Sequence, residues 1–168
     1  MIRAARSRRK EILERPMDAN TLKELTAICG IDCFNCEFFR TNIDNFFATI
    51  PPERKSAFEA RGMTIEKLRC NGCRNGGCTT IGGKCDTLEC AKEKGVDFCY
   101  QCSDFPCRKL QPLAEGAERY PHNLKVYNLT AIKNRGIEAW AAEVGDIRKR
   151  YFRGTFKIGA GPQLAETK

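Results

Sequence analysis

Apolar side chains recur at helix-like intervals in the last third of the chain. One run comprises Leu124, Tyr127, Leu129 and Ile132, and a second comprises Ile137, Trp140, Val144 and Ile147. Residues three and four positions apart lie on the same face of a helix, so each run predicts an amphipathic helix. Gly136 separates the runs, and glycine commonly ends helices. The sequence therefore predicts a C-terminal helical hairpin.

Shorter helical patterns precede this hairpin. They cover residues 20–25, 37–47, 52–61, 64–68 and 86–94, and a further helix is expected to begin near Arg108. The evidence for them is helix-like spacing of apolar residues or a proline or polar residue at the expected start. Residues 151–168 have little periodicity, and we expect a short strand with a tail or an extended arm there.

Between residues 70 and 107 the apolar pattern gives way to cysteine, glycine and asparagine. Seven of the fourteen residues from Cys70 to Gly83 are Gly or Asn, which favour turns. The few apolar residues of this region cannot form a large core. A structural zinc ion contributes about 10–16 kcal/mol of apparent binding energy in small domains. We therefore expect metal binding to decide whether this region folds.

Cysteine is the residue type that indicates the chemistry. The chain has eleven: Cys29, Cys33, Cys36, Cys70, Cys73, Cys78, Cys85, Cys90, Cys99, Cys102 and Cys107. Thiolates separated by two to four residues are typical ligands of a metal ion or an iron–sulfur cluster. A disulfide framework is the alternative, but the odd count and a charged N-terminus without a signal-like apolar run favour a reducing compartment. We expect a soluble, cytoplasmic protein with all eleven cysteines as candidate metal ligands.

Two CxxC pairs lie in the central region. Cys70-x2-Cys73 and Cys99-x2-Cys102 have 25 residues between them, a spacing similar to the two knuckles of a zinc ribbon or treble clef. The eight central cysteines suffice for two four-sulfur sites, and the spacing leaves their grouping open. Ligation by four cysteines suits Zn²⁺ and a [4Fe–4S] cluster equally well.

A third site is expected around Cys29-x3-Cys33-x2-Cys36. Radical S-adenosylmethionine enzymes use this spacing, but only 132 residues follow and they lack the repeated strand–helix units of a barrel. Asp32, His122, another cysteine or water are the candidates for a fourth ligand, and His122 is the only histidine. A redox-active Cys33/Cys36 dithiol remains an alternative. Because no other catalytic motif occurs, an enzyme is the less favoured interpretation.

The net charge of +8 is concentrated at the two ends of the chain. The candidate contacts to an anionic partner are Arg3, Arg6, Arg8, Arg9, Lys10, Arg148, Lys149, Arg150, Arg153 and Lys157. RNA or the ribosome, anionic lipid, an acidic protein and plain solvation of the tails are the open explanations. No stretch approaches the roughly 20 apolar residues that span a bilayer.

Several cysteine motifs occur together and in order. They are Cys29-Gly-Ile-Asp-Cys33-Phe-Asn-Cys36, Cys70-Asn-Gly-Cys73, Cys90-Ala-Lys-Glu-Lys-Gly-Val and Phe105-Pro-Cys107-Arg-Lys-Leu. Over about residues 27–111 the chain resembles the domain-of-unknown-function family 3795. The resemblance implies bound metal, zinc or iron–sulfur, and implies no reaction. The chain departs from relatives in the wide spacing of Cys78 and Cys85 and in having no cysteine after Cys107, where many relatives continue into a zinc ribbon.

These observations predict a small, irregular, α-rich, metal-stabilised domain with zinc-knuckle-like loops, followed by the helical hairpin. The expected divisions are a basic extension (1–19), a cysteine-rich metal-binding domain (20–111), the hairpin packed on it (112–150) and a basic tail (151–168). The expected function is a non-catalytic accessory or electron-transfer subunit of a larger complex. The alternatives are a zinc-stabilised RNA- or ribosome-binding module and a redox enzyme that uses the Cys29/Cys33/Cys36 site.

Overall fold

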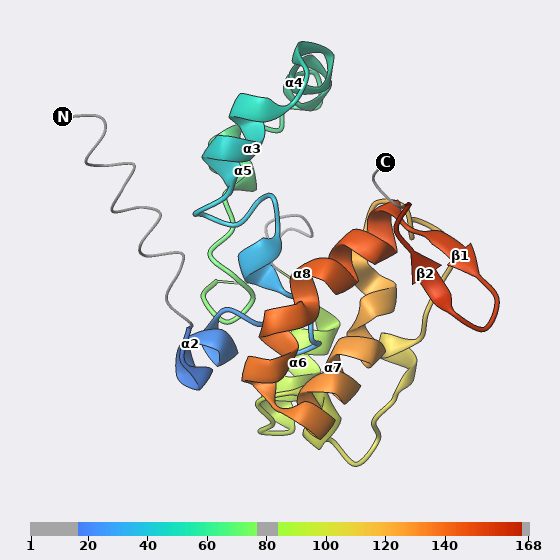
Figure 1. Cartoon of the computed structure of the whole chain (residues 1–168). Coiled ribbons are helices and arrows are strands. Elements are labelled where there is room, and N and C mark those ends of the chain that lie inside the picture. Colours follow the sequence, from blue (N-terminus) through green and yellow to red (C-terminus); the bar gives the residue numbers. More distant parts are fainter. Residues whose placement is uncertain (1–16, 77–83, 166–168) are drawn as a thin grey trace.

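The computed structural model describes residues 17–76 and 84–165 of the chain. These residues are rich in helix, with one small two-stranded sheet near the C-terminus (Figure 1). The α-rich character that the sequence predicts is confirmed. None of the described helices is both long enough and apolar enough to cross a lipid bilayer.

The first half of the described chain contains the 3-10 segment η1 (Cys33–Asn35) and four short α-helices. The α-helices are α2 (Ala19–Glu24), α3 (Ile43–Thr49), α4 (Pro52–Glu59) and α5 (Ile65–Leu68). The last three form an arm that stands away from the rest of the molecule in Figure 1. A separate apolar cluster holds this arm together, with Ile43, Phe47, Ile50 and Leu68 buried. The arm therefore has its own small core.

The helix predicted over residues 37–47 begins later than expected, at Ile43. The preceding residues are occupied by pairing with a distant segment. The Cys70 N–H donates to the Phe38 carbonyl (2.9 Å), and the Arg40 N–H donates to the Cys70 carbonyl (2.9 Å). A backbone that makes these bonds is not available for helix. The pairing brings Cys70 beside the segment that carries Cys36.

Residues 84–123 contain α6 (Asp86–Glu93) and three short 3-10 segments. These segments are η3 (Cys99–Gln101), η4 (Arg108–Leu110) and η5 (Pro121–Asn123). The helix expected from Arg108 is only the three-residue η4. Gln111, which follows η4, precedes a proline and adopts an extended conformation (φ −62°, ψ 133°). The residue before proline is disfavoured in a helix, which explains the early end.

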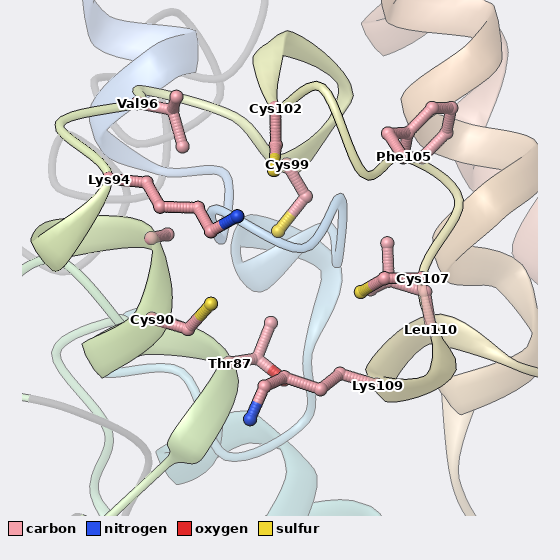
Figure 2. A pocket seen from close by; sticks show the side chains of 11 residues that line it. Thr87, Cys90, Lys94, Val96, Cys99, Cys102, Phe105, Cys107, Lys109 and Leu110 are labelled. Atoms are coloured by element: carbon pink, nitrogen blue, oxygen red, sulfur yellow. The ribbon is translucent and has the colours of Figure 1, made fainter.

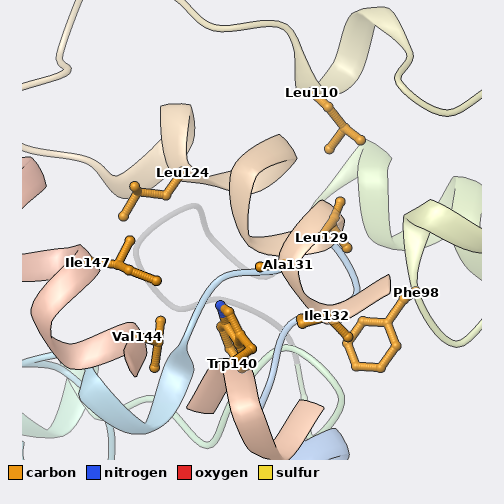
Figure 3. Close-up of a cluster of buried hydrophobic side chains, with 9 residues drawn as sticks. All are labelled: Phe98, Leu110, Leu124, Leu129, Ala131, Ile132, Trp140, Val144 and Ile147. Carbon is orange, nitrogen blue, oxygen red and sulfur yellow. The ribbon is translucent and has the colours of Figure 1, made fainter. Parts of the chain in front are cut away.

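The predicted helical hairpin is present as α7 (Leu124–Arg135) and α8 (Ile137–Arg153), joined at Gly136 with φ 85°. Its facing sides form the main core (Figure 3). The buried members are Phe98, Leu110, Leu124, Leu129, Ala131, Ile132, Trp140, Val144 and Ile147. Full burial of a large apolar side chain contributes about 1.5–3 kcal/mol. Since Phe98 and Leu110 belong to the cysteine-rich region, this core fastens that region to the hairpin.

The segment after α8 is a β-hairpin. Strands β1 (Thr155–Lys157) and β2 (Gly161–Gln163) pair antiparallel, with Phe156 opposite Pro162. Of the two predicted forms of this segment, the strand is the one observed. A Cβ atom at Gly154 would overlap the Arg150 carbonyl oxygen, so glycine permits the turn from helix to strand.

Candidate metal centres

Four cysteines from residues 90–107 surround one small cavity. Cys90 lies in α6, Cys99 begins η3, and Cys102 and Cys107 lie in the loops that follow. The four sulfur atoms point toward a common space in Figure 2, a cavity of about 30 Å³. One water molecule requires roughly 10–15 Å³ of such volume, so this cavity has room for an occupant about the size of two water molecules.

Tight turns bring these cysteines together. The Cys102 N–H donates to the Cys99 carbonyl (3.1 Å), and the Asp104 N–H donates to the Cys102 sulfur (3.4 Å). The Phe105–Pro106 peptide bond that follows is cis. An N–H that donates to sulfur favours the thiolate, which is the form of cysteine that binds metals.

Apolar and cationic side chains complete the cavity wall. The apolar ones are Ala91, Val96, Phe105 and Leu110, and the cationic ones are Lys94 and Lys109. The Lys94 ammonium forms an ion pair with Asp104 (2.5 Å). Hydrogen bonds to Asp104 and to the Cys102 sulfur raise the pKa of Lys94. The cavity thus combines four cysteine sulfurs with a positive charge that would oppose the negative charge of thiolates.

A second cysteine group lies around the loop 29–36. The Cys33 thiol lies close enough to Cys29, Cys70 and Cys73 for their charges to affect its pKa. The Cys73 backbone N–H donates a hydrogen bond to the Cys33 sulfur. Cys36 lies near Cys70. The Gly72 N–H donates to the Cys70 sulfur (3.4 Å), the same contact that Asp104 makes in the first group. This group therefore combines the CxxC pair at 70–73 with the N-terminal cysteines.

The two cysteine groups adjoin each other. The Cys99 N–H donates to the Ile28 carbonyl (3.0 Å), and the Cys29 and Cys99 thiols are electrostatic neighbours. Cys85 is a further neighbour of Cys29. Cys29 and Cys99 therefore stand where one group meets the other.

Burial keeps several of these thiols protonated when no metal is bound. It raises the pKa of Cys29 and Cys36 to about 11, and that of Cys33 and Cys99 to about 12. None of the ten described cysteines forms a disulfide. A metal ion that binds these sulfurs must displace their protons, which is usual for thiolate sites.

Helix α7 positions the loop that carries the first cysteines. The Asn128 side chain, which is fully buried, donates to the Gly30 carbonyl (2.8 Å). Gly30 has φ 85°, and a Cβ there would lie 2.9 Å from the Leu129 Cγ. Glycine is therefore required for this close approach.

Helix α8 also contacts this loop. The Arg148 guanidinium lies 3.4 Å from the Asp32 carboxylate and 2.8 Å from the Glu37 carboxylate. The second oxygen of Asp32 is buried and has no hydrogen-bond partner. The sequence suggested Asp32 as a candidate fourth ligand and Arg148 as a candidate contact to an anionic partner. The local sequence carries no signal for their pairing, because the two residues are 116 positions apart.

Side chains of the described residues do not form a compact single-ion site. No group of three or more His, Cys, Asp or Glu within 17–76 and 84–165 has the arrangement needed to hold one metal ion. The zinc-ribbon-like spacing of Cys70/Cys73 and Cys99/Cys102 left the grouping of the cysteines open, and the structure places the two pairs in different surroundings. Cys99 and Cys102 line a cavity with Cys90 and Cys107, whereas Cys70 and Cys73 adjoin Cys33.

The remaining predicted residues have separate locations. His122 lies in η5, where its Nε2 bonds to the Gln111 carbonyl (2.9 Å), and it is absent from the wall of the cysteine cavity. Lys149 pairs with Asp146, whereas Arg150, Arg153 and Lys157 are exposed. The predicted residues outside the described ranges are Cys78, Arg3, Arg6, Arg8, Arg9 and Lys10.

Comparison with known proteins identifies the family. Residues 25–112, about half of the chain, match the family model described as "Protein of unknown function (DUF3795)", so the chain belongs to this family. The match covers both cysteine groups and confirms the resemblance found in the sequence. No curated protein and no solved structure matches the chain.

Proposed function

We propose that this protein is a cysteine-thiolate metalloprotein whose main site is formed by Cys90, Cys99, Cys102 and Cys107. One observation carries the proposal: these four sulfur atoms point into a single small cavity. Apolar neighbours limit access of water to the cavity, and such surroundings tune the properties of a metal site. Four cysteine ligands suit a [4Fe–4S] cluster or Zn²⁺, and a single Zn²⁺ ion would require the four sulfurs to rearrange, because no described group is arranged to hold one ion.

The cysteines around residues 29–36 and 70–73 supply ligands for a second site. Backbone N–H groups that donate to sulfur in both groups support this extension, because they stabilise bound thiolates. The sequence leaves a third site open, and the second group has more cysteines than one site requires. The described candidates for a third site are Cys85, which belongs to neither group, and the surplus cysteine of the second group.

The proposed role is that of an accessory or electron-transfer subunit. Contact between the two cysteine groups through Cys29 and Cys99 supports it, because two adjacent redox centres provide a path for an electron. If the sites bind zinc instead of iron–sulfur clusters, the zinc ions would stabilise the loops that form a surface for binding a partner. Neither role requires a substrate.

Cobalt(II) titration of the reduced, metal-free protein tests the main site. Tetrahedral cobalt bound by thiolates absorbs visible light, so each filled site is counted directly. We expect the Cys102→Ser variant to lose one site, because it removes a ligand and changes little else. The Thr87→Ala variant alters the same cavity wall without removing a sulfur and is expected to titrate like wild type. Equal titrations of wild type and Cys102→Ser contradict the proposal.

A further inference from the structure

The β-hairpin after α8 exposes apolar side chains to solvent. Strands β1 and β2 project from the end of α8 in Figure 1, and each residue of β1 is exposed. Phe156 is 74% exposed and Ile158 is 90% exposed, the highest value among the exposed large apolar side chains of the described residues. A two-stranded hairpin alone has little stability in water, and exposed apolar side chains of this kind are typical of a surface that binds a partner.

The turn of this hairpin fixes Ile158 at its tip. The Ala160 N–H donates to the Lys157 carbonyl (3.0 Å), which closes a four-residue turn over 157–160. Gly159, the third residue of the turn, has φ 81°, a conformation that favours glycine. Ile158 therefore occupies the corner, and the small residues after it leave its side chain projecting.

The charged residues of this segment are all positive. No Asp or Glu occurs from Ile147 to Ala165. Arg150, Arg153 and Lys157 are exposed, and none of the three forms an ion pair within the described part of the chain. A projecting apolar tip flanked by cations is complementary to a surface that presents anionic groups above an apolar layer.

We propose that residues 150–164 dock the protein on membranes that contain anionic phospholipid. Phe156 and Ile158 enter the boundary between headgroups and acyl chains, and Arg150, Arg153 and Lys157 contact the phosphates. Leu164, which follows β2 at the open end of the hairpin and is 44% exposed, adds apolar surface to the same segment. The proposal does not depend on the metal site.

Two other occupants fit the surface less well. Single-stranded RNA binds to successive aromatic faces, but Phe156 is the only well-exposed ring on this segment. The Tyr151 and Phe152 rings pack edge to face with centroids 4.9 Å apart, and the Arg148 guanidinium covers the Phe152 ring. A symmetric contact with a second copy would bring like charges together, which disfavours it.

Cosedimentation of the full chain with lipid vesicles tests the proposal. Vesicles of phosphatidylcholine are compared with vesicles of equal parts phosphatidylcholine and phosphatidylserine, at low and high salt. We expect binding to the anionic vesicles only, and weaker binding at high salt because the charges are screened. The double variant Phe156→Ser/Ile158→Ser should reduce partitioning about tenfold or more, given the apolar surface lost. Arg153→Gln/Lys157→Gln should reduce it by about tenfold as well.

Two control variants remove side chains of the same kind elsewhere. Leu113→Ser replaces an apolar residue that is 60% exposed, and Lys92→Gln removes an exposed charge from α6. Both are expected to bind vesicles like wild type. Failure of the wild type to bind anionic vesicles overturns the proposal, as does unchanged binding of the Phe156→Ser/Ile158→Ser variant. The proposal is also overturned if the wild type does not bind vesicles but binds an oligouridine RNA or self-associates, and the Phe156→Ser/Ile158→Ser variant loses that binding or self-association.

Discussion

The Arg148 guanidinium of α8 lies 3.4 Å from the carboxylate of Asp32, which precedes Cys33. Asp32 is fully buried and Arg148 is nine-tenths buried. Burial raises the pKa of Asp32, and the Arg148 charge opposes that change. The ion pair therefore links the C-terminal helix to the loop that carries the first cysteine group, and it explains why a cation from the basic end points inward.

Replacement of Arg148 by methionine tests this link. The change leaves Asp32 buried without its partner, and breaking a buried pair in this way costs about 3–5 kcal/mol of unfolding free energy. Denaturant unfolding measures the loss. The neighbouring Lys149→Met variant removes only an exposed pair with Asp146 and should change stability by less than about 1 kcal/mol. Similar values for both variants would contradict a structural role for the Arg148–Asp32 pair.

The Gly30→Ala variant tests the contact between the cysteine loop and α7. A positive φ costs a non-glycine residue about 1–2 kcal/mol, and the Cβ also meets Leu129 at 2.9 Å. We expect a loss of about 2 kcal/mol or more by thermal or denaturant unfolding. Gly145→Ala is the matched control, because Gly145 lies inside α8 with open space around its Cβ position. The Gly145→Ala substitution should raise the free energy of unfolding by about 0.5–1 kcal/mol. A lower free energy of unfolding for Gly145→Ala, with no change for Gly30→Ala, would contradict the structure.

Lys94 is predicted to support metal binding at the cavity. Four thiolates around a divalent ion leave a net negative charge, which the Lys94 ammonium opposes from the cavity wall. Changes to residues that contact metal ligands typically lower metal affinity by about 10–100-fold, and we expect about tenfold for Lys94→Gln. Competition with a chromophoric zinc chelator measures this affinity. Lys94→Arg should retain most of it.

Two further variants distinguish this charge effect from a structural one. Lys92→Gln removes an exposed charge of the same helix, which pairs with Glu89, and should bind metal like wild type. Asp104→Asn breaks the ion pair with Lys94 but keeps the ammonium at the cavity. If Asp104→Asn weakens metal binding as much as Lys94→Gln, the ion pair and not the ammonium is responsible.

Removal of metal is predicted to loosen the cysteine-rich region before the helical hairpin. The segment 96–108 has few apolar residues of its own, so we expect its order to depend on ligation of its cysteines. Hydrogen exchange should show loss of protection at the Cys99 and Cys102 amides after chelation. Protection of the Val144 amide, which lies in the main core, should persist. Equal protection of the segment with and without metal would contradict a role of metal in its folding.

The sequence predicts the local elements better than the grouping of the cysteines. The periodicity around Trp140 identifies α8 because the core that buries this residue lies on one helix face. The grouping depends instead on which distant segments meet. Cys70 joins the N-terminal cysteines because its backbone pairs with Phe38 and Arg40, and no local pattern records that contact.

Charge patterns are similarly incomplete as predictors. Arg148, Lys149 and Arg150 form one basic run, yet their surroundings differ: Arg148 is buried with Asp32, Lys149 pairs with Asp146, and Arg150 is exposed. Helix geometry turns successive residues by about 100°, so neighbours in sequence face different surroundings. Lys94 was not predicted at the cavity either, because its position depends on the turn that follows α6.

Metal and acid-labile sulfide content per chain, measured on protein purified without oxygen, tests the central claim most directly. The account predicts either zinc without sulfide or iron with an equal amount of sulfide, and loss of one site's content in a Cys90→Ser/Cys102→Ser variant. The Thr87→Ala variant should keep the wild-type content. Wild-type protein that is folded and contains neither metal nor sulfide, and that takes up neither on reconstitution, would contradict the account.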